Sequence, residues 1–238
     1  MNKVLKAILC VLLALISVFL VYKIVEGVMQ PVHFNKQVDA RKAVAIQQLK
    51  DIRDLQVAFK SVNDRYTASF DTLKQFYNEG KMEVVLQIGS KDDSLAVAHT
   101  AEVRKANKGI TDQGLYDLYK KGDNRLVFTI PRKIAVKDTL FTGRTGFDIN
   151  SIDKIPFVHE APITEKTPEN LEMSAIVKTV SGVQVPLFEA KMPYWSLLNG
   201  LDHQLIVNMV AELEDQDRFP GLQVGSVTTP NNNAGNWE

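Results

Sequence analysis

The longest apolar stretch lies at the N-terminus, where no charged residue occurs from Ala7 to Tyr22. Counted from Val4 to Val25, with the flanking lysines extending their amino groups toward lipid headgroups, the segment is long enough to cross a bilayer as one helix. A cleaved signal peptide usually has a shorter apolar region followed by a small-x-small site, and Val25-Glu26-Gly27 is a poor match to that site. We therefore expect residues 1–27 to form a retained transmembrane anchor.

A second hydrophobic pattern follows in residues 28–62. Neither Gly nor Pro occurs from Lys36 to Lys60, and apolar residues recur every seven positions. The recurring residues are Val38, Ala45, Ile52 and Phe59, with Leu49, Leu55 and Val62 beside them. This spacing predicts an amphipathic helix of about 25 residues. Gly27 and Pro31 are expected to end or kink the membrane helix before it.

The apolar stripe of this helix has two interpretations. It packs on the chain's own sheet, or it meets a partner helix or a second copy of the chain. The stripe is short, and Gln48 and Gln56 interrupt its second seam, which favours packing within the chain.

The remaining pattern predicts an α+β domain over residues 63–238, in which the long amphipathic helix packs on a mainly antiparallel sheet. Ser181-Gly182 is typical of a two-residue hairpin turn, and Pro186 indicates that the second hairpin strand lies at a sheet edge. The other expected elements are a turn at 63–65, a helix at 70–78 capped by Ser69, a strand at 81–88, a helix from Thr111 or Asp112 to Lys121, strands at 126–130 and 133–136 separated by Pro131, a turn-rich stretch at 141–168, hairpin strands at 171–180 and 183–190, a helix at 197–213, a strand at 222–227 and a mobile tail at 231–238.

Charge and cysteine content narrow the function classes. The 28 basic and 28 acidic residues balance, so no overall field attracts DNA or RNA, and a nucleic-acid partner is not expected. The single cysteine, Cys10, excludes an intrachain disulfide. It also does not fit a lipoprotein signal, because Leu9 precedes it and the apolar run has barely begun.

Residues 46–73, with the turn Asn63-Asp64-Arg65-Tyr66-Thr67, resemble the end of the long helix in type IV pilins and type II secretion pseudopilins. In those families a helix is half embedded in the membrane and half packed on a sheet. The chain lacks their processing glycine and the glutamate near the mature N-terminus, since its first acidic residue is Glu26.

A second resemblance covers the whole chain. Residues 185–190, 222–226 and 234–238 are similar to uncharacterised single-pass envelope proteins of Bacteroidetes. This likeness implies an inner-membrane protein with a periplasmic C-terminal domain, and it implies no activity.

Motifs for catalysis, cofactors or metals do not stand out. The histidines at 33, 99, 159 and 203 show no metal-ligand spacing. Gly143-Arg-Thr-Gly146 lacks the lysine of a phosphate-binding loop and reads as a turn. Neither His159-Glu160 nor Asp202-His203 makes a proton relay by itself, because neighbouring residues point apart. We therefore predict no catalytic, cofactor-binding or metal-binding residues.

The predicted function is that of a non-enzymatic, membrane-anchored envelope component that assembles with other envelope proteins or with itself. The candidate protein-interaction residues are Val38, Ala45, Ile52, Phe59, Tyr194 and Trp195. For Tyr194 and Trp195 the alternative is that they close the core next to Leu197. For Trp237, docking onto the body is the alternative to a mobile tail. A periplasmic enzyme or ligand-binding domain, with a site built from dispersed residues, is the alternative function. A pilus subunit would require N-terminal processing.

Overall fold

The computed structural model describes residues 3–238, with side chains from Val11 onward, and has an α+β fold. The principal elements are α1 (Lys3–Asn63), α2 (Phe70–Glu79), β1 (Lys81–Ile88), α3 (Ser94–Ala106), α4 (Asp112–Lys120), β2 (Phe128–Ala135), β3 (Glu172–Val180), β4 (Val183–Pro193), α5 (Tyr194–Leu197), α6 (His203–Glu214) and β5 (Gly221–Gly225). The chain divides into two compact units. Unit 1 comprises residues 1–53 and 151–238, and unit 2 comprises residues 54–150, so both contain part of the region expected to form one domain.

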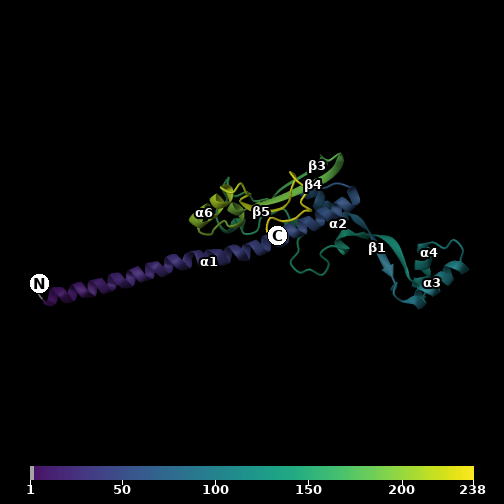
Figure 1. The fold of residues 1–238 in the computed structure, drawn as a ribbon, viewed down its shortest axis with the longest axis horizontal. Coiled ribbons are helices and arrows are strands. Elements are labelled where there is room, and N and C mark those ends of the chain that lie inside the picture. Colours follow the sequence, from purple (N-terminus) through teal and green to yellow (C-terminus); the bar gives the residue numbers. More distant parts are fainter. Residues whose placement is uncertain (1–2) are drawn as a thin grey trace. The chain divides into compact units, whose positions relative to one another are not determined.

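Helix α1 is one continuous helix (Figure 1), and the exposure of its side chains changes along its length. Apolar side chains from Val11 to Val32 are exposed, whereas Phe34 begins a buried stripe that includes Val38 and Ala45. Near its N-terminus α1 is long and apolar enough to cross a membrane, and none of this apolar stretch is buried. A signal sequence meets the same criteria of length and hydropathy. The side chains of Lys6 and Cys10, to which expectations were attached, lie outside the described part.

The sequence predicted that the helix would either end or kink at Gly27 and Pro31. It does not end there. Pro31 lies inside α1. A proline removes one backbone donor from a helix, and the long helical segments on both sides keep the remaining backbone hydrogen bonds.

Unit 1 contains a three-stranded antiparallel sheet in the order β3-β4-β5. The predicted hairpin is confirmed, and Ser181 and Gly182 both have positive φ (51° and 82°), as a tight hairpin turn requires. The edge position predicted for the second strand is wrong, because β4 is central. Pro186 is tolerated because β5 pairs only with β4 residues 189–193, so that Pro186 has a strand partner on one side alone.

Two further predictions for unit 1 are wrong. The helix expected over 197–213 is broken at Gly200, which has φ 87°, and α6 starts anew after Asp202, whose side chain accepts from the Leu205 N–H. The C-terminal tail is held rather than free. Gly235 bridges Val224 of β5, and the Asn236 N–H donates to the Gln223 carbonyl at 2.9 Å.

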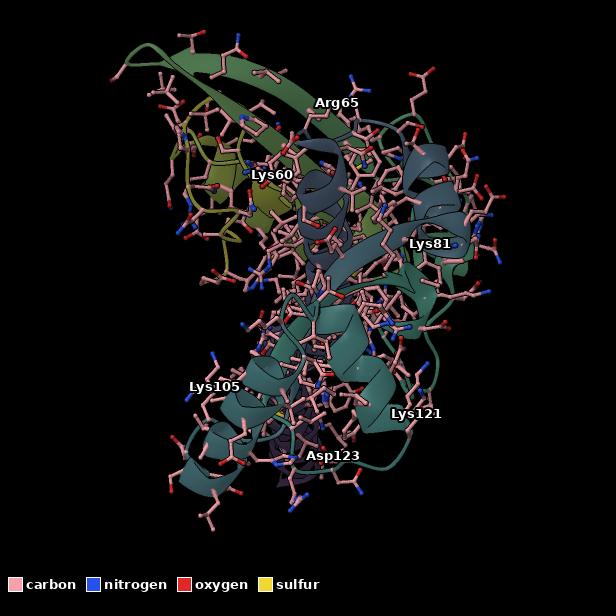
Figure 2. All side chains as sticks on the ribbon, turned by 90° about the vertical axis from the view of Figure 1, so that its right-hand side faces the viewer. Lys60, Arg65, Lys81, Lys105, Lys121 and Asp123 are labelled. Carbon is pink, nitrogen blue, oxygen red and sulfur yellow. The ribbon has the colours of Figure 1, made fainter. Side chains whose placement is uncertain are left out.

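Unit 2 consists of the last turns of α1, then α2, the antiparallel β1–β2 ribbon and helices α3 and α4. Ile88, Leu115, Leu126, Phe128 and Ile130 form a core where α4 packs on the ribbon. Within this unit, Lys81 marks the start of β1 beside α2, and Lys105, Lys121 and Asp123 mark the α3–α4 end (Figure 2).

Three predictions for unit 2 are confirmed, namely the strand Lys81–Ile88, the Ser69-capped helix α2 and the Thr111-capped helix α4. The two short strands expected around Pro131 are one strand, β2, because in a two-stranded ribbon each strand keeps an open edge that tolerates a missing donor. Helix α3, capped by Asp93, was not predicted.

One buried side chain fixes the turn at residues 63–67, on which the resemblance to pilins is based. Gln56 is fully buried, and its amide donates to the Thr67 carbonyl at 2.6 Å while its oxygen accepts from the Thr67 N–H at 3.1 Å. The glutamine that interrupts the apolar stripe therefore holds the chain where it leaves α1.

Candidate functional site

Arg41 is a buried charged residue of α1, and it joins α1 to the rest of unit 1. Its side chain is 8% exposed and pairs with Glu160. The guanidinium also donates to the Leu197 carbonyl at 3.1 Å and the Asn199 carbonyl at 2.9 Å, and it lies 5.0 Å from the centre of the Phe157 ring. Burial lowers the pKa of Arg41, although the Glu160 carboxylate opposes this shift.

Further contacts tie α1 to unit 1 at successive levels along the helix. Closest to the apolar end, the Gln30 amide donates to the Asp202 carboxylate at 2.6 Å. Farther along, Gln48 donates to the carbonyls of Ile152 and Lys154 at 2.9 and 2.7 Å. The position of each contact along α1 shows how far the partner segment lies from the apolar end of the helix.

The C-terminal residue makes the last of these contacts, because Arg53 pairs with Glu238 at 2.7 Å. The hydrogen bond from Arg53 lowers the pKa of the Glu238 side chain. At the other end, the Leu205 backbone N–H and then the Gln30 amide lower the pKa of the Asp202 carboxyl.

A cavity of about 340 Å³ lies between α1, α6, β5 and the C-terminal tail. Its wall combines two cations, one carboxylate and three aromatic rings: Lys42, Arg218, Glu212, Tyr194, Phe219 and Trp237. The Lys42 amino group lies 4.9 Å from the centre of the Tyr194 ring, which leaves Arg218 as the exposed cation at the rim. The size and mixed lining are typical of a site for a small organic molecule.

The tail that closes this cavity is positioned by its neighbours. The Asn236 amide donates to the Gly221 carbonyl at 2.9 Å, and its oxygen accepts from the Gln223 N–H at 3.0 Å. Trp237 covers Gly235 so closely that a Cβ on Gly235 would lie 2.3 Å from the indole ring. The indole Nε1 of Trp237 is buried without a hydrogen-bond partner. Docking of Trp237 onto the body, the alternative to a mobile tail, is therefore what the structure shows.

The six residues predicted for protein interaction lie mostly in the interior. Val38, Ala45, Ile52, Phe59 and Tyr194 are buried, and Trp195 is half-buried. Phe59 stacks edge-on against Phe76 in unit 2, with ring centres 5.3 Å apart. The stripe is thus covered by the chain itself, the interpretation that its short length favoured, and the residues do not form one surface.

An exposed apolar surface lies instead at the tip of the β3–β4 hairpin. Ile176 and Val183 are 44% and 64% exposed, and the register places them on one face with the half-buried Val180 and Val185. We call these four residues the hairpin patch. The strand alternation that predicted the hairpin also places these side chains, but sequence alone does not show that this face is uncovered.

The histidines lie in separate environments. His99 pairs with Asp123 at 2.8 Å and His159 with Glu169 at 2.9 Å, whereas the His203 ring lies 5.7 Å from that of Trp195. The hydrogen bond to His99 lowers the pKa of Asp123. Among the side chains that the structure describes, no group of three or more His, Cys, Asp or Glu is arranged to hold a metal ion.

Sequence reasoning missed Arg41 and the cavity residues. The signal for Arg41 was available, since a single arginine stands in the apolar stripe between Val38 and Ala45. No such signal exists for Lys42, Arg218 and Trp237, which come together only through the docking of the tail.

Comparison of the chain with known protein families, curated proteins and solved structures gives no match.

Proposed function

We propose that this chain is a non-enzymatic component of the cell envelope, anchored in the inner membrane by α1, with a pilin-like body in the periplasm that assembles with other envelope proteins or with itself. The observation that carries the proposal is the continuity of α1. The exposed apolar part of the helix leads without interruption into the buried stripe that begins at Phe34. A helix of this kind holds a folded body directly on the membrane.

The packing of unit 1 supports the pilin-like part of the proposal. Its second segment, residues 151–238, supplies a three-stranded antiparallel sheet and is tied to α1 by Arg41 and Gln48. Because the α1 stripe is covered, the hairpin patch is the apolar surface that we assign to assembly. Exposed apolar surface of this kind is typical of protein contact sites.

Two measurements test the anchor. The intact mass of the mature protein should correspond to a chain that retains its N-terminal segment, and the protein should stay in the membrane pellet after carbonate extraction. A mature chain that begins near Val28 and is released by carbonate would contradict anchoring.

A charge substitution tests the assembly surface. Co-purification from detergent-solubilised membranes should recover protein partners with the wild type and lose them with Val183→Glu, which places a charge in the hairpin patch. Thr179→Glu is the matched control, because Thr179 is exposed on the opposite face of the same hairpin. Equal recovery with both variants would exclude the hairpin patch, and a wild-type protein that carries no partner would contradict assembly.

The cavity favours a second candidate function, the binding of a small organic anion with an aromatic or aliphatic body. Lys42 and Arg218 would hold the charged group, and the aromatic rings would cover the apolar part. In a thermal-shift screen of aromatic carboxylates, a hit should stabilise the wild type but not Arg218→Gln, whereas Arg125→Gln, outside the cavity, should respond like the wild type.

A further inference from the structure

The contact between Gln30 and Asp202 fixes the height of one end of unit 1 relative to the apolar part of α1. Gln30 follows Val25, the last residue of the apolar segment, by five positions, which is about 7.5 Å along the helix axis. Each headgroup layer of a bilayer is about 5–8 Å thick, the difference between a hydrocarbon core of about 30 Å and a total of about 40–45 Å. The Asp202 carboxylate that accepts from Gln30 therefore lies at the outer border of the headgroup layer.

Three side chains typical of a membrane interface gather at this end of unit 1. His203 follows Asp202 directly and is exposed, and its ring lies 5.7 Å from the ring of the half-buried Trp195. The Lys166 amino group lies 5.7 Å from the centre of the same indole. Tryptophan is enriched where membranes meet water, because its ring is apolar and its N–H is polar, and lysine reaches phosphate groups.

We propose that unit 1 rests on the membrane surface through Trp195, Lys166 and His203, which contact phospholipid headgroups. This inference rests on the proposed anchoring of α1. The hydrogen bond between Gln30 and Asp202 holds this end of unit 1 beside the part of α1 that adjoins the apolar segment. In this proposal Trp195, which the sequence predicts as a protein contact, contacts lipid instead.

The second tryptophan provides an internal control. Trp237 lines the cavity with Lys42 and Ile46, and its neighbour Glu238 pairs with Arg53. These levels of α1 lie 12, 16 and 23 residues beyond Gln30, which is about 18, 24 and 35 Å along the helix axis. The chain has only these two tryptophans, so each can be observed alone after replacing the other with phenylalanine.

The experiment measures tryptophan fluorescence of the full-length chain in phosphatidylcholine vesicles, with a nitroxide quencher on the lipid headgroup. Trp237→Phe reports Trp195, and Trp195→Phe reports Trp237. A third variant lacking both tryptophans and carrying Tyr22→Trp reports the hydrocarbon region, where acyl-chain bromines are the matching quencher. We expect the headgroup nitroxide to quench Trp195 severalfold more than Trp237, and the bromines to quench position 22 most.

The outcomes separate the headgroup contact from the anchor. If position 22 is quenched by bromines and the protein floats with the vesicles, but Trp195 is quenched no more than Trp237, the anchor stands and the headgroup contact is wrong. If position 22 is not quenched and the protein does not float, the anchor is wrong and the headgroup contact falls with it. Selective quenching of Trp195 in vesicles of lipid alone supports the proposal, since no protein partner is then present.

Discussion

Replacement of Arg41 by alanine should destabilise unit 1, because it removes the polar contacts that join α1 to residues 157–199. The substitution leaves the carbonyls of Leu197 and Asn199 without their donor and removes the guanidinium that pairs with Glu160 and lies over Phe157. Two hydrogen bonds to a charged group contribute about 1.5 kcal/mol each at the lower end of their range, and the ring contact adds about 0.5–1 kcal/mol. The expected loss is therefore about 3.5–4 kcal/mol.

Thermal unfolding in detergent micelles, followed by tryptophan fluorescence, measures this loss. For a chain of this size each kcal/mol lowers Tm by about 2–4 °C, so Arg41→Ala should unfold roughly 7–16 °C below the wild type. Lys42→Ala is the neighbouring control, because it loses only a contact with the Tyr194 ring. Arg41→Lys keeps the charge but cannot reach both carbonyls, so its Tm should lie between those of Arg41→Ala and the wild type.

A Tm for Arg41→Ala equal to that of Lys42→Ala would refute this reasoning. Such a result would mean that water replaces the arginine without a loss of stability. The contacts of Arg41 would then not be what joins α1 to the rest of unit 1. Glu160→Gln checks the ion pair separately. Because the Glu160 side chain is 51% exposed, its pairing should be worth at most about 1 kcal/mol.

Three further substitutions test local features. The pKa of Asp123 is lowered by His99, so Asp123 stabilises the fold above its unfolded-state pKa of about 4 and this contribution is lost as the pH falls through its lowered value. His99→Gln should raise that pKa in an NMR titration of the carboxyl carbon, and an unchanged value would contradict the assignment. Gly235→Ala should displace the indole of Trp237 and shift the emission of that residue, as the sole tryptophan, to longer wavelength. Ser181→Asn should raise Tm by about 1–3 °C, because asparagine accepts positive φ in a hairpin turn, and a lower Tm would argue against this turn.

Local signals were sufficient to predict much of the secondary structure. The strand Lys81–Ile88, the cap at Ser69 and the turn at Ser181-Gly182 each depend on a few neighbouring residues. Helix α3 was missed because its buried positions are the small Ala96 and the polar Thr100, whereas its large apolar residue Leu95 is 82% exposed. Its signal was the capping Asp93 followed by a run without Gly or Pro.

Errors around proline and glycine have a common physical origin, because the tolerance of these residues depends on partners distant in sequence. Pro186 occupies a central strand because β5 is too short to reach it, and the length of β5 cannot be read from the sequence of β4. The sequence interpretation placed Gly200 inside a helix, whereas its φ of 87° is not helical and interrupts the helix there. The cavity was out of reach for the same reason, since it requires the tail to dock beside β5.

The two surfaces that we assign to lipid and to assembly should act independently, because they lie at different levels of unit 1. The Trp195 ring contacts the ring of His203, the residue that follows Asp202, whose carboxylate accepts from Gln30. The hairpin starts near the level of Gln48, through the bridge between Lys154 and Asn170, and in Figure 1 it extends away from the α6 end. A partner on the hairpin patch therefore lies in the aqueous compartment, about 27 Å or more beyond the level of Gln30. Val183→Glu should accordingly release partners without changing the quenching of Trp195 by headgroup nitroxides. A loss of both would mean that assembly, and not α1, holds unit 1 against the membrane.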